Sequence, residues 1–236
     1  KIQYGTIKTT RVDETSEDFE SVKEYIQSVI TDKSITYLEF QNDATAGQSH
    51  TLGDLFGQVE SIDSDEITFY GHSKGTTYTR QGVYTNGPPH YHCNWKSIRG
   101  IMAWSHVSMA YSLEDIAYIE EKFLEGFNAF GILKKCLGQN IRKHAIIPDG
   151  RFGYLGSFFW FRNSTVFGEG WKGKFYDHPE TCSRWGIEQF PYTMGISYED
   201  AYCDFYSNGV AQYAHDFKVW CRALRDGKLY RIEEPS

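Results

Sequence analysis

The segment Glu66–Gly75 (EITFYGHSKG) constrains the possible fold of the chain more than any other segment does. Residues 67–70 are apolar, aromatic or β-branched, which favours a short buried strand, and glycines flank the turn that follows. His72 and Lys74 are therefore expected just past the carboxyl end of a strand, where open α/β sheets bind their ligands. A lysine and exposed N–H groups suit an anionic ligand. A surface turn with a solvated lysine is the alternative.

The rest of the chain alternates between helical and strand-like hydrophobic patterns. Ser112 is a candidate N-cap for the helix that follows it. The predicted strands are 1–8, 35–40, 67–71, 127–133 and 154–161, and the predicted helices are 16–30, 51–59, 97–111, 113–124 and 210–225. Strands that alternate with helices predict a single α/β domain, 1–236, with a mostly parallel central sheet flanked by helices.

Composition argues against several classes of protein. Hydrophobic residues make up 40% and charged residues 23% of the 236-residue chain, which is typical of a globular protein. The net charge of −7 argues against a nucleic-acid binder, and no apolar run reaches the roughly 18 to 20 residues that span a bilayer. Five cysteines without a C-x-x-C pair favour reduced thiols and a cytoplasmic location. A first residue other than Met is expected either of a processed protein or of a domain cut from a longer chain.

Two polar segments are candidates for metal binding. The long loop 76–94 contains His90-Tyr91-His92-Cys93, with side chains that can ligate zinc, but no second ligand pair stands at a recognisable spacing. A loop that covers a ligand explains it better. Asp63-Ser64-Asp65 has the D-x-D pattern of a divalent-ion site. It precedes the predicted strand and so lies at the end opposite His72, which favours a solvated turn.

Two later segments contain residues suited to a catalytic or binding site. Glu188 stands in an apolar and aromatic segment, where a carboxylate's pKa tends to rise and the group becomes usable as a base. A glutamate that caps a helix or forms a salt bridge is the alternative. Gly153, Gly156 and Ser157, in or beside the predicted strand 154–161, indicate a close backbone approach by a ligand or by a packed helix.

In their order along the chain, these segments resemble the GT-A-type glycosyltransferase-like proteins of bacterial polysaccharide clusters and large viruses. That family carries an H-x-K-G turn, an H-[FY]-x-G-N-F-W-W strand and, further on, an acidic residue. The matching residues are His72, Lys74, Gly75, Gly156, Phe158, Trp160 and Glu188. The resemblance covers roughly residues 51–195. The family's leading His is Gly153 here and its Asn is Ser157, so the acceptor contacts differ, or the fold is kept without the activity.

The resemblance implies a GT-A, Rossmann-like glycosyltransferase of the hexosyl- or deoxyhexosyltransferase class, acting in polysaccharide or glycan biosynthesis. A nucleotide-sugar donor would bind in the half about 1–95, and a glycan acceptor in the half about 96–236. The implied donor-binding residues are Thr6, Asn42, Asp43, His72, Lys74 and Gly75. The implied acceptor-binding residues are Gly156, Ser157 and Trp160, with Trp160 as a platform on which a sugar stacks.

Glu188 is the implied catalytic residue. In an inverting reaction it would deprotonate the acceptor hydroxyl, and in a retaining reaction it would position the substrates. The cofactor stays open between none and a manganese or magnesium ion, for which Asp43 offers a single carboxylate.

Two other functions stay open. One is a catalytically silent module of a larger polysaccharide enzyme that binds nucleotides or carbohydrates. The lack of a D-x-D after the strand and the changes at Gly153 and Ser157 favour it. The other is a hydrolase built on the loop 90–93.

Overall fold

The structure is a computed structural model of the chain. It describes residues 7–9, 19–29, 31, 35–39, 52–72, 105, 108–132, 134–136, 151–154, 156–177 and 186–203, and the contacts given below are those of these residues. The predicted loop 76–94 and the predicted helix 210–225 lie outside them. Among the helices of the described ranges, none has the length and apolar character needed to span a membrane.

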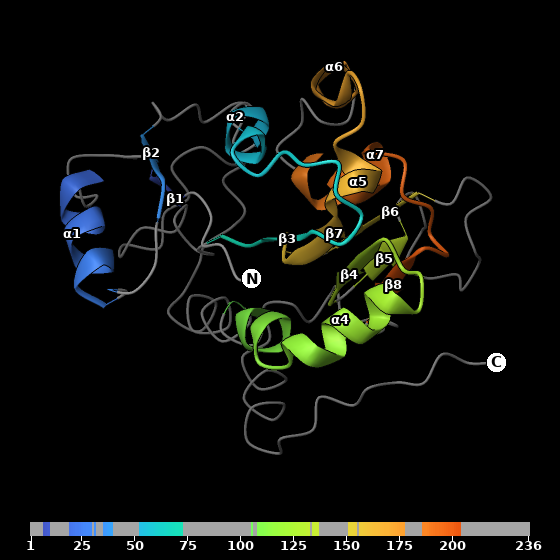
Figure 1. Ribbon diagram of the computed structural model, residues 1–236, viewed down its shortest axis with the longest axis horizontal. Helices are drawn as coiled ribbons and strands as arrows, with labels where there is room; N and C mark the ends of the chain where they lie inside the picture. Colours follow the sequence, from blue (N-terminus) through green and yellow to red (C-terminus); the bar gives the residue numbers. More distant parts are fainter. Residues whose placement is uncertain are drawn as a thin grey trace, which may run out of the picture.

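The larger sheet of the described residues has four strands, in the order β3 (Ile67–Tyr70), β7 (Phe159–Arg162), β4 (Ala129–Gly131) and β8 (Ala201–Cys203). β7 runs antiparallel to both of its neighbours, whereas β4 and β8 are parallel. The sheet is therefore mixed, because β7 opposes the direction that the other three strands share (Figure 1). The predicted α/β class is confirmed in this form, although two of the three pairings are antiparallel.

Two further strand pairs are described. β1 (Ile7–Thr9) and β2 (Tyr37–Glu39) pair in parallel, with α1 (Phe19–Val29) between them in the sequence. This is the order of a β–α–β unit, in which a helix returns the chain so that the second strand can run parallel to the first. β5 (Lys134–Cys136) and β6 (Phe152–Tyr154) form an antiparallel pair.

The sequence predicts a single strand over the apolar run 154–161. In the structure this run comprises the end of β6, a turn and the start of β7. The Ser157 N–H donates to the Tyr154 carbonyl at 3.0 Å and closes the turn. Gly156 has φ +88° and Ser157 φ +59°, which are left-handed conformations that a strand does not accommodate. The hydrophobic pattern hides the turn, because Phe158 on its far side is fully buried as well.

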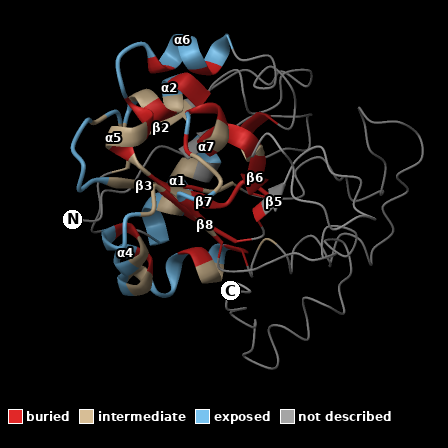
Figure 2. Cartoon of the chain, turned by 90° about the vertical axis from the view of Figure 1, so that its right-hand side faces the viewer, coloured by how far each residue is buried: buried red, intermediate tan, exposed pale blue. Residues whose placement is uncertain are grey.

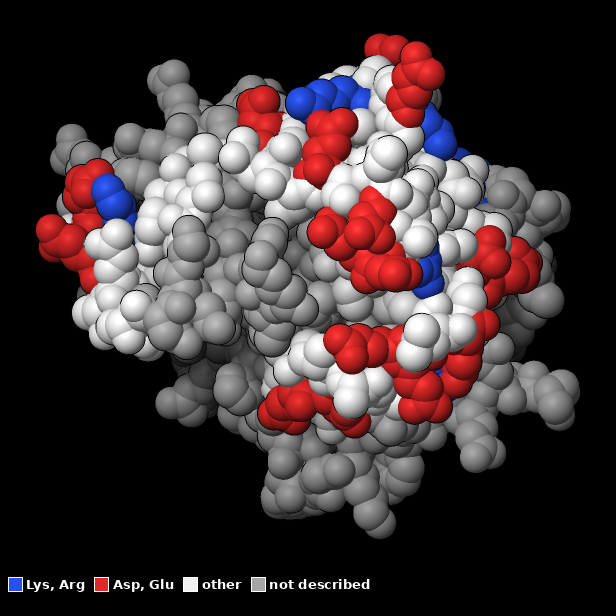
Figure 3. All heavy atoms as spheres, viewed as in Figure 1, with Lys and Arg blue, Asp and Glu red and all other residues white. Residues whose placement is uncertain are grey.

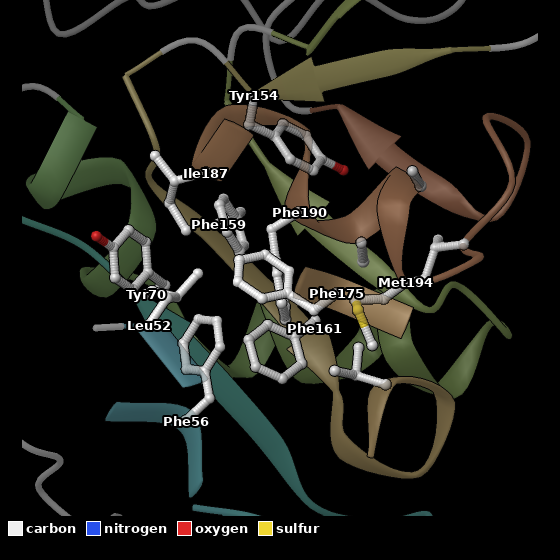
Figure 4. Close-up of a cluster of buried hydrophobic side chains, with 14 of the residues drawn as sticks. Leu52, Phe56, Tyr70, Tyr154, Phe159, Phe161, Phe175, Ile187, Phe190 and Met194 are labelled. Carbon is white, nitrogen blue, oxygen red and sulfur yellow. The ribbon is translucent and has the colours of Figure 1, made fainter. Parts of the chain in front are cut away.

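The larger hydrophobic cluster lies on one face of the sheet, under four short helices. These are α2 (Leu52–Gly57), α5 (Asn163–Val166), α6 (Trp171–Tyr176) and α7 (Phe190–Thr193). Phe159 and Phe161 reach into the cluster from β7, and Figure 4 shows them against Phe56, Phe175 and Phe190. Burying one phenylalanine contributes about 1.5–3 kcal/mol, so these rings supply much of the free energy that holds the helices on the sheet.

The opposite face of the sheet is covered by α4 (Ile116–Leu124), which buries one side and exposes the other (Figures 1 and 2). Trp160 alternates with Phe159 along β7 and packs on this face. The helix was predicted, but its N-cap is Asp115 and not Ser112: Asp115 Oδ1 accepts the Tyr118 N–H at 3.0 Å. Residues 108–113 are helical, so Ser112 belongs to the preceding helix and cannot begin the next one.

Candidate functional site

The side chains of His72 and Glu188, which are far apart in the sequence, both form a hydrogen bond with the backbone of Gly156. His72 Nε2 lies 2.9 Å from the Gly156 carbonyl oxygen, across 84 residues of sequence. The Gly156 N–H donates to Glu188 Oε1 at 3.0 Å, across 32 residues. One residue of the turn between β6 and β7 therefore binds both His72 and Glu188, and it brings together three segments that the sequence singled out separately.

His72 is held by its place after β3 and by an aromatic stack. It follows Tyr70, the last residue of β3, by two positions. Its ring stacks on Phe158, with 5.5 Å between centroids and an interplanar angle of 14°. A carbonyl oxygen can only accept, so Nε2 of His72 carries the hydrogen in its bond to Gly156. The position of the imidazole is thus fixed, and so is the ring nitrogen, Nε2, that carries the hydrogen.

The Gly156–Ser157 turn is a strained piece of backbone. Ser157 is 2% exposed and is the one non-glycine residue with a positive φ in the described part of the chain. A residue with a side chain in this conformation costs about 1–3 kcal/mol, and such residues cluster at ligand sites.

Glu188 lies in a one-turn 3₁₀ helix, η2 (Gly186–Gln189), that runs into α7. Its neighbours Ile187 and Gln189 are buried at 3% and 8% exposure, while Glu188 itself is half-buried. Figure 4 shows Ile187 on the side of the aromatic cluster nearest Tyr70. The core therefore anchors η2 on both sides of Glu188, and the bond from Gly156 orients its carboxylate.

Gly153, in β6, makes the close backbone approach that the sequence indicated. A Cβ atom there would lie 2.8 Å from the carbonyl oxygen of Glu188. The sequence left open whether a ligand or a helix makes this approach. In the structure it is the backbone of η2.

Trp160 lies away from this constellation. Its indole N–H donates to the Ser112 carbonyl at 2.8 Å, and its ring is 5.1 Å from that of Phe69. His72 is close to Tyr70, which points to the other face of the sheet. Of the three predicted acceptor-binding residues, Gly156 and Ser157 therefore adjoin His72 and Trp160 does not. Its role as a sugar platform stays a prediction.

The D-x-D segment lies where the sequence predicted. Asp63 and Asp65 are exposed in the turn before β3, at the end of the strand opposite His72. The Asp65 N–H donates to Asp63 Oδ1 at 2.9 Å. Acidic side chains gather over this turn and over α4 on the face drawn in Figure 3. Such a triplet, solvated and at the end of the strand opposite His72, does not fit a role in holding a metal against a ligand bound at His72.

Several predicted residues fall outside the described ranges. They are Thr6, Asn42, Asp43, Lys74, Gly75 and the loop residues His90, His92 and Cys93. Within those ranges, no group of three or more His, Cys, Asp or Glu side chains is arranged to hold a metal ion.

Sequence reasoning missed two features of this region. One is Phe158 as the stacking partner of His72; its position two residues after Gly156 was visible, but its contact with a residue that follows β3 was not. The other is Lys134, which is 6% exposed. Its ammonium donates to the carbonyls of Tyr198 and Ala201 and lies 3.8 Å from the Tyr198 ring centroid. A lysine beside another lysine is usually solvated, so nothing in the sequence indicated that the side chain of Lys134 is buried.

No protein-family model, curated protein or solved structure matches this chain.

Proposed function

We propose that this protein is a glycosyltransferase that moves a sugar from a nucleotide-diphosphate donor to a hydroxyl of a glycan acceptor. The observation that carries the proposal is the pair of hydrogen bonds made by the Gly156 backbone. One binds His72, just past the end of β3, and the other binds the carboxylate of Glu188. A basic turn for the leaving group and a fixed carboxylate for the acceptor are the two parts that such a reaction needs.

The donor side of the proposal rests on the segment that follows β3 in the sequence, residues 71–75. A diphosphate leaving group gains negative charge as the glycosidic bond breaks, and a positive group must meet it. His72 lies just past the carboxyl end of β3, and Lys74 and Gly75 follow it along the chain. We assign the diphosphate to this segment.

The acceptor side rests on Glu188. In an inverting reaction its carboxylate takes the proton of the acceptor hydroxyl while that oxygen attacks the anomeric carbon. The bond between the anomeric carbon and the diphosphate breaks, and the nucleoside diphosphate leaves with the electron pair. A base must be held in place to act, and the bond from Gly156 at 3.0 Å together with the buried neighbours Ile187 and Gln189 holds this one.

The test is the change Glu188→Gln, which keeps the size of the side chain and its ability to accept the Gly156 N–H but removes its basicity. Release of nucleoside diphosphate is measured with a panel of uridine, guanosine and thymidine diphosphate sugars and a glycan acceptor. We expect transfer to fall by roughly 10²–10⁴-fold, the usual scale for a general base, while donor binding persists. Glu169→Gln, at an exposed position, is the matched control. Near-normal turnover of Glu188→Gln would remove Glu188 from the mechanism.

The second candidate is the silent binding module. The same hydrogen bonds favour it, because His72 and Glu188 both bind backbone atoms of Gly156, as side chains that merely secure a turn do. A ligand that binds only the folded state raises its stability. Stabilisation by nucleotides or glycans with no transfer from any donor would select this candidate.

A further inference from the structure

The space beside Gly153 is occupied by the backbone of Glu188. A Cβ at residue 153 would lie 2.8 Å from the Glu188 carbonyl oxygen, 3.1 Å from its carbonyl carbon and 3.5 Å from Gln189 Cγ. Contacts under 3.0 Å to a backbone atom do not persist, so either β6 or η2 must move when residue 153 has a side chain. Glycine is the residue that permits a backbone to come this close.

η2 has little freedom to move away without losing packing. Ile187 belongs to the large hydrophobic cluster, and Phe190, the first residue of α7, is fully buried in it. β6 in turn is paired with β5, with Gly153 opposite Lys135. A displacement at residue 153 is therefore expected to rotate or shift η2 at Glu188, the partly exposed residue between its buried neighbours.

We propose that Gly153 is a positioning residue for Glu188: by leaving room for the η2 backbone, it sets the carboxylate within reach of the Gly156 N–H. The catalytic consequence of this inference rests on the proposed transferase function. The effect of Gly153 on the position of Glu188 does not depend on that function. A misplacement of about 1 Å in a catalytic group can cost about 10²-fold in rate. Gly153, which stands where the resembled family has a histidine, is thus the residue that sets the position of the proposed base, Glu188.

The structural part is tested without any substrate by nuclear magnetic resonance. The Gly156 amide proton bonds the Glu188 carboxylate, so its chemical shift should follow the protonation of that carboxylate in a pH titration. Glu188→Gln should abolish this titration, and Gly153→Ala should reduce or abolish it.

Two glycines serve as controls. A Cβ at Gly53 would lie 2.2 Å from the Tyr176 hydroxyl oxygen, in the contact between α2 and α6, and a Cβ at Gly168 would meet nothing within 4 Å. Gly53→Ala should destabilise the fold and leave the Gly156 titration intact, and Gly168→Ala should change neither. If Gly153→Ala is too unstable to fold in buffer, the titration is done in sucrose, which favours the folded state and does not itself titrate.

The catalytic part is tested by a double-mutant cycle. Gly153→Ala should lower transfer by about 10²-fold in the otherwise unchanged protein and should lower it no further in the Glu188→Gln background, because a residue that acts through Glu188 has nothing left to position. A Gly156 titration that Gly153→Ala leaves unchanged, or losses that multiply in the double variant, would overturn the proposal. A lost titration in a protein that transfers no sugar would support the placement of Glu188 and count against the transferase function alone.

Discussion

Arg162, at the end of β7, joins three segments of the chain, and its removal should destabilise the fold strongly. Its guanidinium donates to the Phe123 carbonyl at 2.6 Å and to Asn128 Oδ1 at 3.2 Å, and it also donates to the Ser64 carbonyl. It thereby connects the end of α4, the segment before β4 and the turn before β3. Arginine suits this position because its planar group presents five donors in a fixed geometry.

The cost of Arg162→Met can be worked from these bonds. Each hydrogen bond to a charged group contributes about 1.5–3 kcal/mol, and a carbonyl left buried without a partner adds a penalty. Because Arg162 is partly exposed, water can replace some of these bonds. Three bonds at the lower end of the range amount to about 4.5 kcal/mol, and replacement of some of them by water lowers the expected cost to about 3–4 kcal/mol. For a chain of this length that corresponds to a fall in Tm of about 6–16 °C.

Urea unfolding of Arg162→Met and Arg162→Lys measures the effect. The lysine variant should recover only about a third of the loss, because a single ammonium cannot reach three separated acceptors. Lys23→Met, which breaks the surface pair with Glu20 at 3.4 Å, changes the net charge equally and should cost less than about 1 kcal/mol. A loss of under about 1 kcal/mol for Arg162→Met would refute the reasoning.

Two further predictions concern alkaline pH and donor binding. Burial raises the pKa of Tyr154 well above its ordinary value of 10.0. Above pH 10 the unfolded chain therefore loses this proton while the folded protein keeps it, and stability should fall by about 1.4 kcal/mol per pH unit for this group. In urea unfolding between pH 9 and about pH 11, Tyr154→Phe should remove this fall, which amounts to about 1.4 kcal/mol over the whole range, and exposed Tyr25→Phe should not; equal slopes for Tyr154→Phe and the parent would contradict this. Lys74→Ala should weaken nucleotide binding in calorimetry, whereas Asp63→Ala and Asp65→Ala should change it little, with manganese or with a chelator. Full chelator sensitivity combined with a harmless Lys74→Ala would show ordinary metal-dependent chemistry instead.

The elements with a clear local pattern could be predicted from the sequence. The strand before His72, α1, α2 and α4 all have apolar residues at the right period, and each is present within a few residues of its expected bounds. The direction of β7 could not be predicted, since a strand's own residues do not state whether its neighbours run with it or against it. The turn at Gly156 was hidden for a related reason, because apolar residues continue on both sides of it.

The candidate site was predicted only as separate parts. His72, Gly156 and Glu188 were each singled out for local reasons, namely a basic turn, a glycine in an apolar run and an acid among aromatic residues. That they touch depends on how β3 and β7 pair and on the fit of η2 against Gly153. Those are long-range contacts, which no local pattern encodes. For Trp160 the resemblance implies a contact with a sugar, which stays a prediction; its indole N–H donates to the Ser112 carbonyl on the opposite face of the sheet.

The central claim is that His72, Gly156 and Glu188 form one site for a nucleotide-sugar. The most direct measurement is to titrate nucleoside diphosphates into ¹⁵N-labelled protein and follow the amide of Gly156, whose N–H donates to Glu188 and whose residue accepts the His72 hydrogen bond at its carbonyl. We expect a saturable change in that signal, with a preference among the bases. If no nucleoside diphosphate or nucleotide-sugar moves the Gly156 signal at millimolar concentration, the claim is contradicted.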